Sequence, residues 1–96
     1  MPDATIAARA WRRGDFATAV THYEAVVRLE PGRARPNFLL GRSLERLGES
    51  AKARARYERA LAIDPQLSEA RNALTELRRR ETRPRESKAT PGNAGP

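Results

Sequence analysis

Chemistry in this sequence has to come from charged side chains, because the groups that usually perform catalysis or bind metals are scarce. His22 is the single histidine, there is no cysteine, and the Asp and Glu residues are scattered along the chain. Catalytic triads and zinc sites need several such groups within bonding reach of one another. No glycine-rich phosphate loop is present either. The sequence therefore predicts no catalytic residue, no metal site and no cofactor, and we expect a protein that is not an enzyme.

Arginine is the one chemically distinctive residue that is abundant. The formal net charge is +7, and only two of the nineteen basic residues are lysine. Such a balance attracts nucleic acid, acidic lipid or acidic protein. Acids nevertheless alternate with the arginines at helical spacing, as in Glu24 with Arg28, Glu76 with Arg80 and Glu45 near Arg42. Opposite charges three or four residues apart form ion pairs on solvent-exposed helix faces. We therefore interpret most of this charge as an ion-paired surface rather than a binding site.

The length of the chain and its apolar content limit which classes of protein it can belong to. The 96 residues suffice for one small domain, and without cysteine no disulfide can stabilise it. The longest apolar stretches are far shorter than a membrane span, and no basic cluster precedes an apolar run at the N-terminus. We therefore expect a cytoplasmic protein with no membrane partner.

The elements that position these side chains follow from an internal repeat. Pro31 and Pro65 lie thirty-four residues apart, and glycine, alanine, tyrosine and glutamate recur at the same offset. The recurring pairs are Gly14 and Gly48, Ala19 and Ala53, Tyr23 and Tyr57, and Glu24 and Glu58. A period of this length is the signature of a helical repeat array. It predicts an all-α fold and a protein that binds a partner.

Helices are predicted throughout the repeats. Ala, Leu, Arg and Glu dominate, and apolar residues recur every three or four positions. Gly14 and Gly48 suit helix ends at positive φ, while Asp15 and Ser50 carry oxygens that suit the caps of the following helices. The predicted helices cover residues 3–13, 16–29, 35–47, 50–63 and 68–81.

The combined spacing resembles that of the tetratricopeptide repeat family. The family's pattern has large, Leu-Gly, aromatic, Ala, aromatic and Pro positions. In the second repeat these positions hold Asn37, Leu40-Gly41, Leu44, Ala53, Tyr57 and Pro65, with Ala60 between the last two. In the first repeat the corresponding residues are Asp3, Ile6-Ala7, Ala10, Ala19, Tyr23 and Pro31, with Val26 between the last two. Asp3 and Asn37 depart from the family, which has a bulky residue at that position.

The resemblance implies an α-solenoid of antiparallel helix pairs with about five helices. Within a domain at residues 1–81, repeat 1 covers about 1–33, repeat 2 about 34–67, and a capping helix about 68–81. The capping helix has one narrow apolar stripe, which is typical of a terminal helix whose other face is polar and exposed to solvent. Residues 82–96 contain three prolines and no apolar residue larger than Ala, so we expect a disordered basic tail there.

The resemblance also implies a concave groove, lined by the first helix of each pair, that binds a peptide or helix of a partner protein. Arginines beside aromatic rings suit a partner with acidic and apolar side chains. Trp11 has two interpretations: it faces this groove, or it packs on the third helix near Phe38 or Leu39. The predicted groove residues are Trp11, Arg12, Arg35, Phe38, Leu39, Arg42, Glu45, Arg46, Asn72 and Arg79.

Two alternative functions stay open. A homodimer would complete a short array, because about three repeats are usually needed for stability and the chain has two and a cap. Nucleic-acid binding is suggested by the charge, but the interleaved acids and few aromatic residues argue against it. The identity of the partner does not follow from the sequence.

Overall fold

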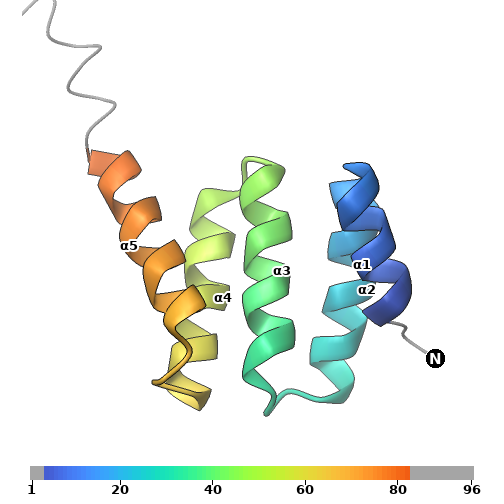
Figure 1. Ribbon diagram of the computed structural model, residues 1–96, viewed down its shortest axis with the longest axis horizontal. Coiled ribbons are helices and arrows are strands. Elements are labelled where there is room, and N and C mark those ends of the chain that lie inside the picture. Colours follow the sequence, from blue (N-terminus) through green and yellow to red (C-terminus); the bar gives the residue numbers. More distant parts are fainter. Residues whose placement is uncertain (1–3, 83–96) are drawn as a thin grey trace, which may run out of the picture.

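The computed structural model describes residues 4–82, which form five helices (Figure 1). Their bounds are α1 (Ala4–Arg13), α2 (Phe16–Leu29), α3 (Ala34–Arg46), α4 (Ser50–Ile63) and α5 (Ser68–Thr82). The helix pairs α1–α2 and α3–α4 stack side by side, and α5 packs on α4. The predicted all-α repeat fold is confirmed, with described helix ends within one residue of the prediction.

The predicted tail lies outside the described residues except for Thr82, which is the last residue of α5. Residue 3, predicted to begin the first helix, also lies outside them. The remaining one-residue differences concern α3, which starts at Ala34 and ends before Leu47.

The turns between paired helices depend on glycine. Gly14 and Gly48 have φ values of 83° and 84°, in the region that side chains with a Cβ rarely adopt. After the first turn, Asp15 caps α2 by accepting a hydrogen bond from the Thr18 backbone N–H at 3.2 Å. Hydrogen bonds from Thr18 lower the pKa of the Asp15 carboxyl.

The prediction that Ser50 caps the next helix is wrong. Ser50 is the first residue of α4, Glu49 holds the cap position, and no side chain makes the capping hydrogen bond. The repeat period explains the difference, because Glu49 is the residue thirty-four positions after Asp15. Ser50 therefore corresponds to Phe16, one position inside the helix.

Small residues bring the paired helices close enough for one large ring to fill each interface. Ala19 and Ala53 are fully buried, and Tyr57 has no exposed surface. A Cβ on Gly41 would lie 2.6 Å from Cε1 of Tyr57, so α3 and α4 can pack this closely only with glycine there. The Tyr57 ring also packs on Phe38, with centroids 6.0 Å apart.

Asn37 occupies the position where the family has a bulky residue, and it is fully buried. Its Nδ2 donates to the Arg33 carbonyl at 3.0 Å, and its Oδ1 accepts from Nη1 of Arg56 at 2.9 Å. Both ends of the amide are therefore satisfied, which removes most of the cost of burying it. The second bond ties the Arg56 side chain of α4 to α3.

Candidate functional site

Two adjoining cavities run along the side of the molecule formed by α1, α3 and α5. The first has a volume of about 290 Å³ and is lined mainly by α1 and α3. The second, of about 520 Å³, lies between α3 and α5. The cavities share Phe38, Arg42 and Glu69, so they form one continuous surface, which we call the inner groove.

Most of the predicted groove residues come together here. Arg46 lies beside the first cavity, on the rings of Trp11 and Phe16, whereas Arg79 lines neither cavity. The predicted residues that line the inner groove are Trp11, Arg12, Arg35, Phe38, Leu39, Arg42, Glu45 and Asn72. Their role in binding stays a prediction.

Arginine and aromatic side chains of three helices are interleaved at the α1 end of the groove. Trp11 packs edge-on against Phe16, with ring centroids 4.9 Å apart. The Arg42 guanidinium lies 5.1 Å from the Trp11 centroid and 5.9 Å from that of Phe38. The Arg46 guanidinium lies 5.6 Å from the Trp11 centroid and 4.8 Å from that of Phe16. Cations at these distances are attracted to the ring faces.

Both interpretations of Trp11 therefore hold. Its side chain is partly buried against the core, and it lines the first cavity together with Phe38 and Leu39. The two arginines above it are one helical turn apart on α3, so the rings hold two like charges close together.

Of the acidic residues that α5 contributes to the groove, sequence reasoning placed Glu76 on the inner wall but missed Glu69. Glu69 lines both cavities, and its Oε1 accepts a hydrogen bond from Nη1 of Arg35 at 2.5 Å. This bond lowers the pKa of Glu69 and raises the pKa of Arg35. The two residues are thirty-four positions apart, so they occupy equivalent positions on α3 and α5. The repeat period is the signal from which this pair follows, once charges are compared between repeats.

Both carboxylate oxygens of Glu45 bind side chains of other helices. Its Oε1 accepts the Tyr57 hydroxyl at 2.6 Å, and its Oε2 forms an ion pair with Arg80. The expected pairing of Arg80 with Glu76 along one helix is thus wrong, because the packing of α5 brings Arg80 to α3. Glu45 therefore joins α3, α4 and α5.

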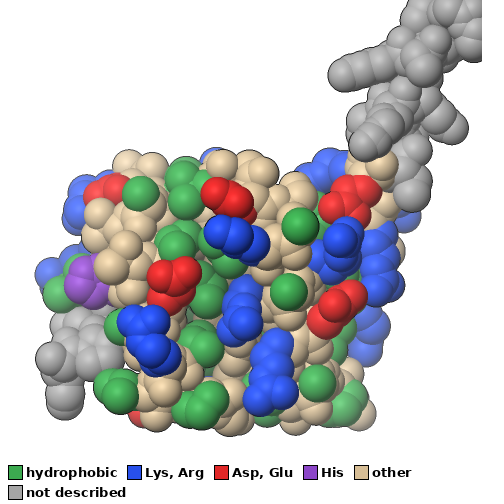
Figure 2. Space-filling view, turned by 180° about the vertical axis from the view of Figure 1, so that it is seen from behind, with side chains coloured by type: hydrophobic (Ala, Val, Ile, Leu, Met, Phe, Trp, Pro, Cys, Tyr) green, Lys and Arg blue, Asp and Glu red, His purple; other side chains and the backbone are tan. Residues whose placement is uncertain are grey.

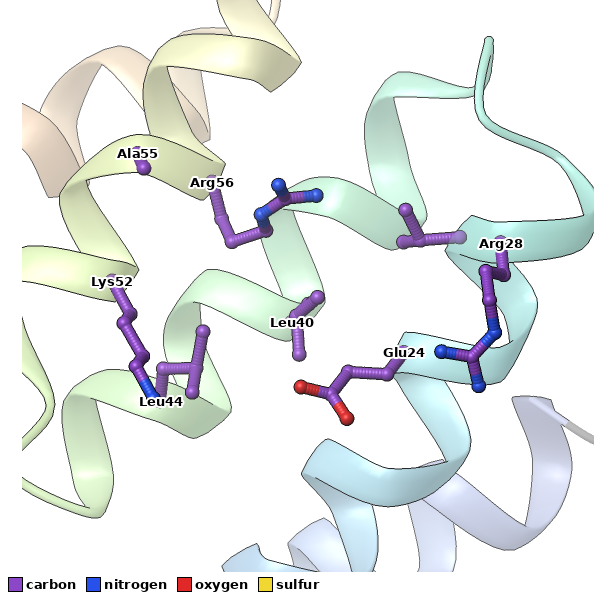
Figure 3. Close-up of a pocket in the computed structure, with 8 residues that line it drawn as sticks. Glu24, Arg28, Leu40, Leu44, Lys52, Ala55 and Arg56 are labelled. Carbon is purple, nitrogen blue, oxygen red and sulfur yellow. The ribbon is translucent and has the colours of Figure 1, made fainter.

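A third cavity, of about 430 Å³, lies on the opposite side of the molecule between α2 and α4 (Figure 3). Leu40 and Leu44 of α3 form its floor, but they are only 3% and 6% exposed. Of the basic residues at its rim, Arg56 is bonded to Asn37, and Lys52 lies 3.9 Å from Glu49. Glu24 and Arg28 also line the cavity and form no ion pair among residues 4–82, so apolar contact rather than charge is limited here.

Basic side chains form a row down the middle of this outer face, and acidic side chains lie on both sides of it (Figure 2). Binding of nucleic acid would call for one contiguous basic face with aromatic rings for stacking. The acidic side chains that border this row are instead typical of the solvent-exposed, ion-paired surface that the sequence predicted.

Other kinds of site have little basis in the described part of the chain. His22 is half-buried on α2 and lines neither groove cavity. Across residues 4–82, no three His, Cys, Asp or Glu side chains are grouped so that they could hold a metal ion. Within the same residues, no helix has the length and apolar content to cross a membrane.

Comparison with known families agrees with this architecture. The family model described as Tetratricopeptide repeat matches residues 5–68, which run from α1 to the first residue of α5. No curated protein matches the chain. Tetratricopeptide repeats generally mediate protein–protein interactions and are typically not enzymes. The match covers both stacked helix pairs, and the chain belongs to the tetratricopeptide repeat family.

Proposed function

We propose that this protein is an interaction module that binds a peptide or helix of a partner protein in the inner groove. The family supports a protein partner, and the groove is the face where cavities, aromatic rings and unpaired charges coincide. The observation that carries the proposal is the pair of guanidiniums of Arg42 and Arg46 on the Trp11 ring.

These two arginines are held in place without being neutralised. Neither forms an ion pair among residues 4–82, whereas Arg35 and Arg80 both do. A guanidinium stacked on a ring still presents its edge N–H groups, which match a carboxylate with two parallel hydrogen bonds. Trp11 supplies an apolar contact next to them. A partner segment with acidic and apolar side chains fits this arrangement.

Replacing both Arg42 and Arg46 with Glu is expected to weaken the binding of such a segment at least tenfold. One charge-assisted hydrogen bond contributes about 1.5–3 kcal/mol, so losing two of them has a large effect. Peptides chosen on an array against the wild-type chain would be measured by fluorescence anisotropy. Lys52→Glu with Arg59→Glu on α4 is the matched control, since it changes the net charge equally away from the groove. Unchanged affinity in the Arg42 and Arg46 variant would show that the groove assignment is wrong.

A second candidate function, homodimerisation, is favoured by one exposed residue. Ile6 on α1 is 41% exposed, although the equivalent residue of the second repeat, Leu40, is 3% exposed. The first helix pair therefore leaves uncovered an apolar position that a preceding repeat would bury. A second copy of the chain packed there would extend the array.

Light scattering at tens of micromolar protein tests this candidate. A homodimer through this face predicts a dimeric wild type and a monomeric Ile6→Glu variant. Arg9→Glu, at an exposed site on the same helix, controls for the added charge and is expected to have a smaller effect. A clean wild-type monomer would rule the candidate out.

A further inference from the structure

The inner groove differs in charge between its two ends. The first cavity, at the α1 end, is lined by three arginines and one glutamate. The second cavity, at the α5 end, is lined by one arginine and three glutamates. The sequence predicted a groove dominated by arginine, so this division of charge is a feature of the tertiary structure.

Ion pairs cancel part of the charge on each side. Arg35 is paired with Glu69, and Glu45 is paired with Arg80. The net charge at each end of the groove therefore comes from the residues in or beside it that form no ion pair among residues 4–82. These are Arg12, Arg42 and Arg46 on α1 and α3, and Glu76 on α5.

We propose that the groove binds a partner segment whose charges are opposite on the two sides of an apolar residue. The acidic side chain lies over Arg42 and Arg46, the apolar side chain rests against Ala73 in the second cavity, and the basic side chain lies beside Glu76. This inference rests on the proposed function, and it specifies which segment that function selects. Complementary charges of this kind set the register of a bound segment more than its affinity.

The repeat also sets the spacing of the two charges. Arg42 and Glu76 are thirty-four residues apart, so they occupy equivalent positions on α3 and α5. Both side chains line the second cavity, and a cavity of about 520 Å³ is roughly 10 Å across. An extended chain rises about 3.3 Å per residue, so the acidic and basic residues of the segment are about three positions apart.

A library of displayed random peptides, selected on the full-length chain, tests the proposal. The wild type is expected to enrich peptides with an acidic and a basic residue about three positions apart and an apolar residue between them. Glu76→Lys is expected to abolish the preference for the basic residue and to keep that for the acidic one. Arg42→Glu with Arg46→Glu is expected to do the reverse.

Matched controls separate local charge from total charge. Glu24→Lys on α2 changes the net charge as Glu76→Lys does, and Lys52→Glu with Arg59→Glu matches the double arginine variant. Both controls are expected to select the same peptides as the wild type. Circular dichroism on each variant verifies that the helices are retained.

A charge-exchange measurement gives the sharpest result. Replacing the basic residue of a selected peptide with Glu is expected to weaken binding to the wild type about threefold to fivefold. The Glu76→Lys variant is expected to recover that loss. No recovery would overturn the proposal.

Other outcomes distinguish this inference from the proposed function. Selection of purely acidic and apolar peptides would overturn the inference and leave the groove as a binding site. Selection of no peptide at all would overturn both. A wild-type dimer that becomes monomeric with Arg42→Glu and Arg46→Glu would show that a second copy fills the groove, and this too overturns the inference.

Discussion

Replacing Tyr57 with Ala is expected to lower the free energy of unfolding by about 3–5 kcal/mol, the cost of deleting a buried aromatic ring. Tyr57 has no exposed surface, packs on Phe38 and fills the space above Gly41. Small domains have a total stability of about 5–15 kcal/mol, so this variant is expected to be close to unfolding. Urea denaturation followed by far-ultraviolet circular dichroism measures the loss. A loss below about 1 kcal/mol would contradict the packing described here.

Tyr57→Phe is the matched control, because it keeps the ring and removes the hydroxyl that donates to Glu45. Near neutral pH it is expected to cost about 1.5–3 kcal/mol, the usual contribution of a hydrogen bond to a charged group. The variant thus separates the effect of the ring from that of the hydroxyl.

The same variant reports the ionisation of Tyr57 at high pH. Burial raises the pKa of Tyr57 from 10.0 to about 12, so folding favours the protonated form. That stabilisation is fully present below pH 10 and is lost as the pH rises through 12. Over this interval the wild type is expected to lose about 2–3 kcal/mol more than Tyr57→Phe. An equal loss in both proteins would show that Tyr57 is not the group responsible.

Replacing Gly41 with Ala is expected to destabilise the protein by about 1–3 kcal/mol, the usual cost of overpacking a core. Its Cβ would lie 2.6 Å and 2.8 Å from two ring carbons of Tyr57, and 3.3 Å from the Ala53 carbonyl oxygen. This loss is expected even though Ala favours helix over Gly by about 1 kcal/mol. The midpoint of thermal or urea unfolding measures it.

Two further variants make the result specific. Gly32→Ala is the control, since a Cβ there meets no atom within 4 Å, and it is expected to leave stability unchanged or slightly raised. In a Tyr57→Ala background, Gly41→Ala is expected to cost little, because the clashing ring is gone. Additive losses in that double-mutant cycle would show that Gly41 and Tyr57 do not form the contact.

The position of the groove was largely predictable, but the partners of its charged residues were not. Eight of the ten predicted residues line its cavities, because the repeat period assigns each position of a first helix to one face. The acid at Glu69 was missed, since comparing charges along single helices does not show a partner on another helix. Ser50 was misplaced for a related reason: the period, rather than residue type, assigns the cap to Glu49.

By itself, the sequence determined the helices, their order and their buried faces. These properties depend on local spacing: glycines at two turns, prolines that end each repeat, and small or aromatic residues at fixed positions. Only the tertiary structure decided which arginines are neutralised, because ion pairs depend on distances between different helices. Arg35 meets Glu69 of α5, whereas Arg42 and Arg46 lie on aromatic rings of α1 and its neighbours and keep their charge available.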